Sequence, residues 1–370
     1  MAHAATPHGT RRFRDRHVGR VPASHFRTAA GDLSVGSLGI GTYLGDPDDD
    51  TDAAYVDALR TAFRLGTNLV DTAINYRAQR SERAVGRALA AAIAAGEVAR
   101  DEVVVCSKAG YLPFDGSYPT DPSRWFYEAY VKSGLLAPSD IVAGGHSIAP
   151  AWLAHQIDRS RANLGVETID VYYLHNPESQ LASVPRAEVM SRVGRAFATL
   201  ENAVAAGKIR CYGVATWNGL RVTRSARDYL SVAELVRIAE REVGRDHHFR
   251  AVQLPCNLGM TEAVTERSQP VGDGVGSLVE AADHYRLTVI ASASLLQGKL
   301  VRALPDMLAR VFGGCRTDAQ RALQFVRSTP GVTTALAGMR SRAHVEENLA
   351  LAAVAPADDD TYVQLFDGSS

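Results

Sequence analysis

The sequence predicts a protein of class α/β, folded as a (β/α)8 TIM barrel in a single domain with long loop insertions. Eight short apolar runs, rich in β-branched residues, alternate with longer segments of helical period. This alternation is typical of parallel strands joined by helical crossovers. Eight such units favour a closed barrel over an open doubly wound sheet, and 370 residues suffice for one barrel.

The eight predicted strands are spread along most of the chain. They are 38–41, 68–71, 102–107, 168–174, 209–214, 249–254, 287–291 and 332–336. Two of the intervening helices also carry clear end signals. One has Pro150 in its first turn after Ser147 and ends at Gly165, and another repeats apolar residues over 189–204 and ends at Gly207.

Both ends of the chain are predicted to lie outside the barrel. We expect a basic, flexible N-terminal tail over 1–26, the barrel over 27–355 and a C-terminal tail over 356–370. The first segment carries five arginines against one acidic residue, Asp15. It lacks the apolar run of a secretory signal, so a transit peptide or an anion-binding arm remains the functional alternative to a frayed tail.

Composition excludes several classes of protein. At 46% hydrophobic and 22% charged residues, the chain resembles an ordinary globular protein. A net charge of −1 argues against a nucleic-acid partner, and no apolar run reaches the roughly 18 residues of a membrane helix. The four cysteines have no metal-like spacing, so we expect no metal site, reduced thiols and a cytoplasmic location. The pattern carries no signal for an oligomeric state.

Four polar residues stand at or just after the ends of predicted strands, where (β/α)8 barrels place their active sites. Asp71, Lys108 and His175 end three successive strands, and Tyr76 lies in the loop after the first of them. Taken singly, the Asp is often a helix N-cap and the His a structural residue. Lys108 is one of only four lysines. The combination therefore predicts an active site.

The chemistry of these four side chains is coherent. A phenol with a pKa near 10 is a poor acid at neutral pH, but a neighbouring ammonium lowers that pKa. A carboxylate keeps the ammonium charged and oriented, and an imidazole can hold a carbonyl oxygen. Tyr76, Lys108, Asp71 and His175 together would suit protonation of the oxyanion that forms when a hydride reaches a carbonyl carbon.

The motif at residues 71–82, DTAINYRAQRSE, resembles the signature of the aldo-keto reductase superfamily, as do CSKAG around Lys108 and VYYLHNPE around His175. The resemblance runs from about residue 27 to about residue 352. It implies that Tyr76 is the general acid and base, that Lys108 and Asp71 tune it, and that His175 orients the carbonyl. The implied activity is NAD(P)H-dependent transfer of hydride to an aldehyde or ketone, or from an alcohol in reverse.

The same resemblance implies NADPH as the cofactor, with NADH possible, extended over the barrel mouth. The Rossmann fingerprint is absent, and the glycines at 272, 274 and 276 are expected in a flexible loop. The residues that would hold the cofactor follow from several strand ends and from the motif at 338–348. They are Gly41, Thr42, Thr216, Asn218, Gln253, Ser292, Ser294, Leu295, Gln297, Gly298, Gly338, Arg340, Arg342, His344, Glu347 and Asn348.

Individual roles within this set also follow from the resemblance. Gln253 would bind the carboxamide together with either Thr216 or Asn218, and the choice between the last two stays open. Arg340 would meet a 2′-phosphate, and the acidic and amide residues at 347–348 would meet the adenine. The family's usual aromatic after the seventh strand is missing, and Trp217 is a candidate replacement.

The substrate is expected to be a small carbonyl compound or alcohol held between aromatic side chains. Tyr43 follows the first strand, and the long connection from 109 to 146 is rich in aromatic residues, which favours an ordered lid over the mouth. The predicted pocket residues are Tyr43, Tyr111, Trp125, Phe126 and Trp217.

Two other functions remain open at this point. The first is a Schiff-base lyase or aldolase with Lys108 as the nucleophile, although an amine nucleophile needs a lowered pKa and a neighbouring Asp71 would raise it. The second is a cofactor-binding sensor or partner subunit with slow turnover, which the altered nicotinamide contacts would suit.

Overall fold

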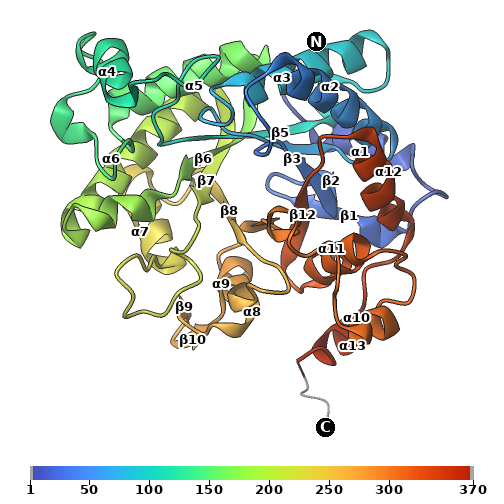
Figure 1. Ribbon diagram of the computed structural model, residues 1–370. Coiled ribbons are helices and arrows are strands. Elements are labelled where there is room, and N and C mark those ends of the chain that lie inside the picture. Colours follow the sequence, from blue (N-terminus) through green and yellow to red (C-terminus); the bar gives the residue numbers. More distant parts are fainter. Residues whose placement is uncertain (1–2, 367–370) are drawn as a thin grey trace.

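The computed structural model describes residues 3–366, and its centre is a closed barrel of eight parallel strands (Figure 1). The last barrel strand pairs with the first, in register Ala335 with Leu38, so the sheet has no free edge. The chain is thus a (β/α)8 barrel, and all eight predicted strands are confirmed. They are β3 (Leu38–Gly41), β4 (Leu69–Asp71), β5 (Val104–Ala109), β6 (Ile169–His175), β7 (Ile209–Ala215), β8 (Phe249–Pro255), β11 (Thr288–Ser292) and β12 (Val332–Gly338).

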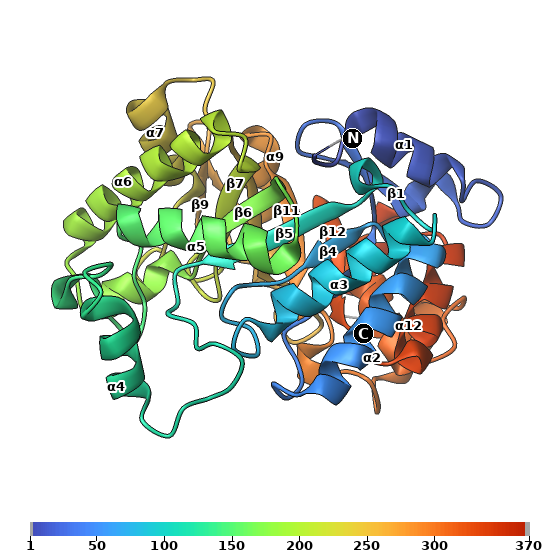
Figure 2. The same ribbon diagram turned by 90° about the horizontal axis from the view of Figure 1, so that it is seen from above.

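Helices between the strands form the outer layer of the barrel (Figures 1 and 2). The predicted helix ends are confirmed at Gly165 and Gly207, whose φ angles of 63° and 69° lie in the left-handed region. The N-cap of α5 is Ala149 rather than Ser147. The main helices are α2 (Asp49–Arg64), α3 (Arg80–Ala94), α5 (Pro150–Leu164), α6 (Arg186–Ala205), α7 (Val232–Val243), α9 (Leu278–His284), α11 (Asp318–Ser328) and α12 (Arg342–Leu349).

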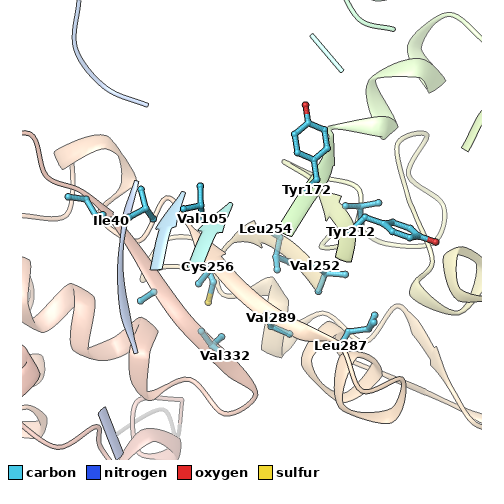
Figure 3. Packing of buried hydrophobic residues seen from close by; sticks show 14 of the residues in the cluster. Ile40, Val105, Tyr172, Tyr212, Val252, Leu254, Cys256, Leu287, Val289 and Val332 are labelled. Carbon is cyan, nitrogen blue, oxygen red and sulfur yellow. The ribbon is translucent and has the colours of Figure 1, made fainter. Parts of the chain in front are cut away.

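Alternate residues of each strand face opposite sides of the sheet, and they form two separate apolar clusters. The larger cluster fills the space between the strands and the helices, and includes Val105, Tyr172 and Val252 (Figure 3). The smaller cluster fills the barrel interior and includes Cys106 and Tyr173, the neighbours of Val105 and Tyr172. This alternation fixes which strand-end side chains face the interior.

The N-terminal segment is folded, which corrects the prediction of a flexible tail for residues 3–26. Helix α1 (Pro7–Asp15) buries Phe13 completely, and Arg12 and Arg16 bind the buried carboxylate of Glu102. The hairpin of β1 (Phe26–Ala29) and β2 (Leu33–Gly36) follows, and its apolar residues pack against those that begin the barrel strands. The segment therefore closes the amino-terminal end of the barrel (Figure 2).

The C-terminal segment is folded up to the last described residue. Helix α13 (Asp359–Val363) buries Tyr362, whose hydroxyl hydrogen-bonds Thr329 at 2.9 Å. The expectation of a tail over 356–370 is therefore wrong for residues 359–366, and residues 367–370 lie outside the described part of the chain. Short helices α8 (Glu262–Thr265) and α10 (Asp306–Val311) complete this side of the molecule.

The long connection between β5 and α5 is ordered, but it does not form the predicted lid. It carries α4 (Pro122–Phe126) and a π-helical turn, Tyr127–Val131, on the outer side of α5 (Figures 1 and 2). Three of its aromatic residues, Trp125, Phe126 and Tyr130, build a separate small core with Trp152 of α5, in which Trp125 and Phe126 are partly buried.

The glycine-rich segment at 272–276 is a hairpin, not the flexible loop that we predicted. Strands β9 (Gln269–Val271) and β10 (Gly274–Gly276) pair antiparallel, with Gly272 at φ 54° in the turn. All four cysteines are buried and unpaired with one another. Among residues 3–366, no helix has the length and hydropathy needed to cross a membrane.

Candidate active site

The strand alternation carries four polar side chains to the carboxyl end of the barrel interior. Asp71, Lys108, His175 and Gln253 have the same orientation along their strands as the interior cluster residues Leu69, Cys106, Tyr173 and Ala251, two positions earlier in each case. A parallel barrel gathers these strand ends at one mouth. The structure therefore brings together the three predicted strand-end residues, with Gln253 beside them.

Asp71 connects two of these side chains. One carboxylate oxygen, Oδ2, accepts a 2.5 Å hydrogen bond from Lys108 Nζ, and the other, Oδ1, accepts a 2.8 Å bond from Gln253 Nε2. Lys108 Nζ also donates to the carbonyl of Thr72 at 2.8 Å. The carboxylate and the ammonium are both buried, so each depends on the other for its charge to be compensated.

The phenol of Tyr76 lies against this ion pair. Lys108 Nζ is 5.1 Å from the centre of the Tyr76 ring. Burial raises the pKa of Tyr76 and Lys108 opposes that rise, while Asp71 adds to it. Burial lowers the pKa of Lys108, but Asp71 and Tyr76 outweigh it, so the net shift is upward and the lysine stays charged. The predicted lowering of the tyrosine pKa by lysine is present, but burial exceeds it.

His175 faces Tyr76 across the mouth, with the two ring centroids 5.9 Å apart. Burial, with Lys108 and His146 acting in the same direction, lowers the pKa of His175 well below its usual value. The imidazole is therefore neutral at neutral pH. Its Nδ1 is buried without a hydrogen-bond partner in the described structure, and the ring of Tyr111 packs edge-on against it at 5.1 Å.

Two residues behind the site were not predicted. His146 is fully buried, and its Nε2 forms a hydrogen bond with the carbonyl of His175 at 2.7 Å. Its Nδ1 forms a second hydrogen bond with Gln180 Nε2 at 2.8 Å. Glu178 Oε1 accepts hydrogen bonds from three consecutive backbone N–H groups, those of residues 217–219. Glu178 could have been noticed in the sequence, because it follows His175 by only three positions. His146 lies at the end of an insertion, and no sequence pattern marks it.

A cavity of about 850 Å³ opens above these residues, and Asp71, Tyr76 and His175 lie in its wall. Most of the predicted cofactor and substrate residues line it too. They are Gly41, Thr42, Tyr43, Tyr111, Thr216, Trp217, Gln253, Ser292, Ser294, Leu295, Gln297, Gly298, Gly338, Arg340, His344, Glu347 and Asn348. Lys108 lies beneath the cavity wall.

Four predicted residues do not line the cavity, because other parts of the protein bind them. The Asn218 side chain accepts from Arg221 at 2.9 Å, and Arg342 forms two hydrogen bonds with Asp57. Trp125 and Phe126 belong to the small core on α5. The structure therefore corrects the expectation that these four residues lie at the cavity.

Of the two candidates left open, Thr216 lines the cavity and Asn218 does not. The Thr216 hydroxyl is buried at the cavity and has no hydrogen-bond partner among the described residues. The same is true of Asn348 Oδ1, at the opposite end of the cavity. A polar group bound in the cavity beside each of these two atoms would satisfy it.

The far half of the cavity has features of an anion site. Ala293, Leu296 and Gln297 have positive φ angles of 53°, 45° and 53°, a backbone conformation that turns N–H groups toward one side. Arg340 lies at the cavity rim and is exposed, whereas Arg342 two residues later is paired with Asp57. The positive-φ backbone at 293–297 and the cation at Arg340 fit the phosphate groups of a dinucleotide.

Comparison with known proteins gives a consistent result. A sequence model of the Aldo/keto reductase family matches residues 37–240. A D-threo-aldose 1-dehydrogenase from Pseudomonas sp. is 24% identical over 332 residues, covering 87% of this chain and 89% of the relative. An NADH-specific methylglyoxal reductase from Escherichia coli K12 is 28% identical over 211 residues, or 55% of this chain and 54% of the relative.

Solved structures of similar shape agree in fold. An aldo/keto reductase from Klebsiella pneumoniae in complex with NADP and acetate has a TM-score of 0.62 at 20% identity, and covers 93% of this chain and 94% of its own. An aldo-keto reductase from the same organism in complex with NADPH has a TM-score of 0.58 at 21% identity, with 92% and 94% covered. At these identities the likeness concerns the fold.

Proposed function

The chain belongs to the aldo/keto reductase family, and on that premise we propose that it is an NAD(P)H-dependent oxidoreductase that interconverts a small aldehyde or ketone and the corresponding alcohol. One observation carries this proposal. Tyr76 lies in the wall of the cavity, next to a charged Lys108 and opposite a neutral His175. This arrangement provides a proton, a charge that stabilises the phenolate, and a hydrogen-bond donor for a carbonyl oxygen.

In the proposed mechanism, a bound nicotinamide supplies or accepts the hydride. During reduction, the Tyr76 hydroxyl gives its proton to the carbonyl oxygen. Lys108 stabilises the phenolate that remains, and Asp71 holds Lys108 in place through the 2.5 Å hydrogen bond. His175 has its Nδ1 buried, which leaves Nε2 to donate to the same carbonyl oxygen. The alcohol oxidation follows the same path in reverse.

The cofactor would extend along the cavity from the catalytic residues to α12. Thr216 and Gln253 would hold the carboxamide, and Trp217, which is 42% exposed in the cavity wall, would cover the nicotinamide face. Among residues 293–297, the backbone N–H groups other than that of Leu296, which donates to the Ala293 carbonyl, would bind the pyrophosphate, and Asn348 would meet the adenine. NADP and NADPH are present in the two Klebsiella structures, which supports the assignment.

We propose NADPH as the preferred cofactor, because Arg340 is the exposed cation at the rim of the adenosine half. Replacement by alanine, Arg340→Ala, should weaken NADPH binding by about 10-fold to 150-fold and leave NADH binding nearly unchanged, since a charged hydrogen bond contributes about 1.5–3 kcal/mol. Arg342→Ala is the matched control, because Arg342 is bound to Asp57. Tryptophan fluorescence titration with each nucleotide measures both affinities. Equal losses in the two variants would contradict the assignment.

The substrate end of the cavity favours small uncharged carbonyl compounds. The side chains that surround Tyr76 there are aromatic or neutral, namely Tyr43, Tyr111, Asn176 and Trp217. The names of the two relatives, an aldose dehydrogenase and a methylglyoxal reductase, support carbonyl compounds of this size.

The two alternative functions have less support. A Schiff-base nucleophile must reach its substrate as a neutral amine. Lys108 is fully buried and lies outside the cavity lining, and its pKa is raised. A sensor without turnover would not need the Asp71–Lys108 pair beside a tyrosine.

Turnover by a Tyr76→Phe variant tests the proposed mechanism. Phenylalanine keeps the ring and removes the proton, so kcat for small aldehydes with NADPH should fall by about 100-fold or more, while the affinity for NADPH stays within the wild-type range. Borohydride trapping of substrate on Lys108 should fail. Full turnover by Tyr76→Phe on every accepted substrate would overturn the role given to Tyr76.

A further inference from the structure

The backbone immediately after Tyr76 has an unusual conformation. Arg77, Ala78 and Gln79 have φ angles of 47°, 53° and 67°, so three consecutive residues with side chains lie in the left-handed region. This region is disfavoured for such residues because Cβ approaches the carbonyl oxygen, and they normally enter it singly. Backbone of this kind persists only where the surrounding structure fixes it, and it is frequent at functional sites.

Arg77 provides the main contacts that fix this turn. Its side chain is 2% exposed, and Nη1 donates to Asp52 Oδ1 at 2.7 Å and to the carbonyl of Asp46 at 3.3 Å. Nε donates to Ser81 Oγ at 3.0 Å. The guanidinium also lies over the ring of Tyr55, 4.9 Å from its centroid. A planar cation with several donors can reach these groups at once, whereas an ammonium cannot.

A second anchor holds the other end of the turn. Gln79 Nε2 donates to the carbonyl of Phe114 at 2.9 Å, and its Oε1 accepts from Arg159 at 2.9 Å and from Asn163 at 3.1 Å. Both ends of the left-handed segment are therefore tied to neighbouring elements. Ala78 between them is fully buried, and its carbonyl accepts a hydrogen bond from the Gly116 N–H at 2.9 Å.

The contacts of Arg77 extend to the walls of the cavity. Ser81, which receives Arg77, donates to the carbonyl of Thr42, and Tyr55, which lies under it, donates to the carbonyl of Leu44. Thr42 and Leu44 both line the cavity. Asp71 lies in β4, which fixes the chain before Tyr76. The turn held by Arg77 fixes the chain after Tyr76.

We propose that Arg77 is a positioning residue, which places the Tyr76 hydroxyl by holding a strained left-handed turn against the loop at 42–46. This proposal rests on the role given to Tyr76 above. A displacement of about 1 Å in a reacting group can cost about 100-fold in rate. Arg77→Lys keeps a buried cation beside Asp52 but cannot reproduce the contacts, so kcat should fall between about 10-fold and 100-fold with KM for the carbonyl little changed.

Arg87→Lys is the matched control. Arg87 Nη2 also binds Asp52, at 3.0 Å from Oδ2, but its side chain is 55% exposed and it lies in α3, away from the turn. This variant should keep wild-type kcat and KM. Circular dichroism and NADPH titration establish that both variants are folded before turnover is measured. An equal loss of kcat in the two variants would overturn the proposal, because it would show a general effect of the Asp52 ion pairs.

A double variant separates positioning from general destabilisation. If Arg77 acts through Tyr76, adding Arg77→Lys to Tyr76→Phe should change the residual rate by less than about twofold, because residues that act as a unit are not additive. A full additional loss in the double variant would overturn the proposal. If Tyr76→Phe itself keeps full turnover, the proposed function fails first, and that result is distinct from a failure confined to Arg77.

Relief of the strain provides a further readout. Glycine enters the left-handed region without the Cβ penalty, so Ala78→Gly in the Arg77→Lys background should restore part of kcat. The same substitution in the wild-type chain should change kcat little. If it restores nothing, Arg77 does not act through the conformation of the turn.

Discussion

The two oxygens of Asp71 have different partners, and this division organises the site at the scale of single residues. Oδ2 holds Lys108 under the Tyr76 ring, whereas Oδ1 holds Gln253 at the wall where we place the nicotinamide. A single carboxylate thus couples the proton-donating side of the cavity to the cofactor side. Asparagine at this position would keep the shape and lose the charge that keeps Lys108 protonated.

The raised pKa of Tyr76 predicts opposite pH dependences for the two directions of the reaction. Reduction needs the phenol, so its rate should be constant from neutral to mildly alkaline pH and decline only above the usual tyrosine value of about 10. Oxidation needs the phenolate, so its rate should rise as the pH is raised from neutral to alkaline values. Profiles of kcat in both directions measure this. Lys108→Met removes a group that lowers the pKa of Tyr76, so the rising limb for oxidation should move to higher pH, and movement to lower pH would contradict the assignment.

Residue-level prediction from the sequence succeeded where strand geometry alone determined the outcome. Asp71, Lys108 and His175 could be placed together because strand ends in a barrel meet at one mouth. Asn218 and Arg342 do not line the cavity, and Arg221 and Asp57 bind their side chains. Without the fold, the sequence does not show which of two neighbouring polar side chains is bound by another residue of the protein.

At the scale of secondary-structure elements, the loop after β7 depends on one carboxylate. Glu178 is 6% exposed, and its Oε1 accepts the N–H groups of Trp217, Asn218 and Gly219. Burial raises the pKa of Glu178, and these N–H groups oppose the rise. The carboxylate therefore fixes the loop that carries Trp217 into the cavity wall.

Removal of this carboxylate should loosen the loop. In Glu178→Ala three backbone N–H groups lose their acceptor, so the Trp217 ring should become more accessible to acrylamide and the affinity for NADPH should fall about tenfold. Glu178→Gln retains a carbonyl oxygen of the same shape and should keep most of both properties. Fluorescence quenching and nucleotide titration measure them. Unchanged quenching in Glu178→Ala would show that other contacts order the loop.

The insertions were the elements that the sequence predicted least well. Trp125 and Phe126 were assigned to the cavity because aromatic side chains are common in binding sites, but they pack in a separate small core with Trp152 of α5. The hairpin at 269–276 has strands of only three residues, too short for a period-two pattern to be visible. In both cases tertiary packing determined the structure.

On the scale of the whole molecule, the two ends of the barrel have different roles. The carboxyl end carries the cavity and its charged groups, and the amino-terminal end is closed by α1 and the β1–β2 hairpin. Glu102 at that end is fully buried between Arg12 and Arg16, which lower its pKa against the effect of burial. The arginines at 12 and 16, which suggested a frayed basic tail, therefore belong to the ordered structure of that end.

Two buried histidines predict that the fold weakens in mild acid. Burial lowers the pKa of His25 and of His146 to about 4 from 6.5. The unfolded chain then binds more protons than the folded one between these values, so the free energy of unfolding should be greatest above pH 6.5 and fall as the pH drops toward 4, by about 3 kcal/mol for each histidine.

Denaturant unfolding at a series of pH values measures this slope. His25→Gln removes one titrating group and should give a shallower dependence on pH between 6.5 and 4 than the wild-type chain. His8→Gln, at an exposed position of α1, should keep the wild-type slope. If His25→Gln and the wild type lose stability in parallel, the acid sensitivity comes from other groups.

All four cysteine thiols are buried, so none of them is accessible to thiol reagents at the protein surface. Burial raises the pKa of Cys211 and Cys256 to about 12 and that of Cys315 to about 11, so these groups stay protonated as well as hidden. A cysteine introduced at Tyr118, which is 58% exposed in the insertion, would then be the one thiol that takes up a maleimide dye. The native chain is thus ready for site-specific labelling, with its own tryptophans as energy donors.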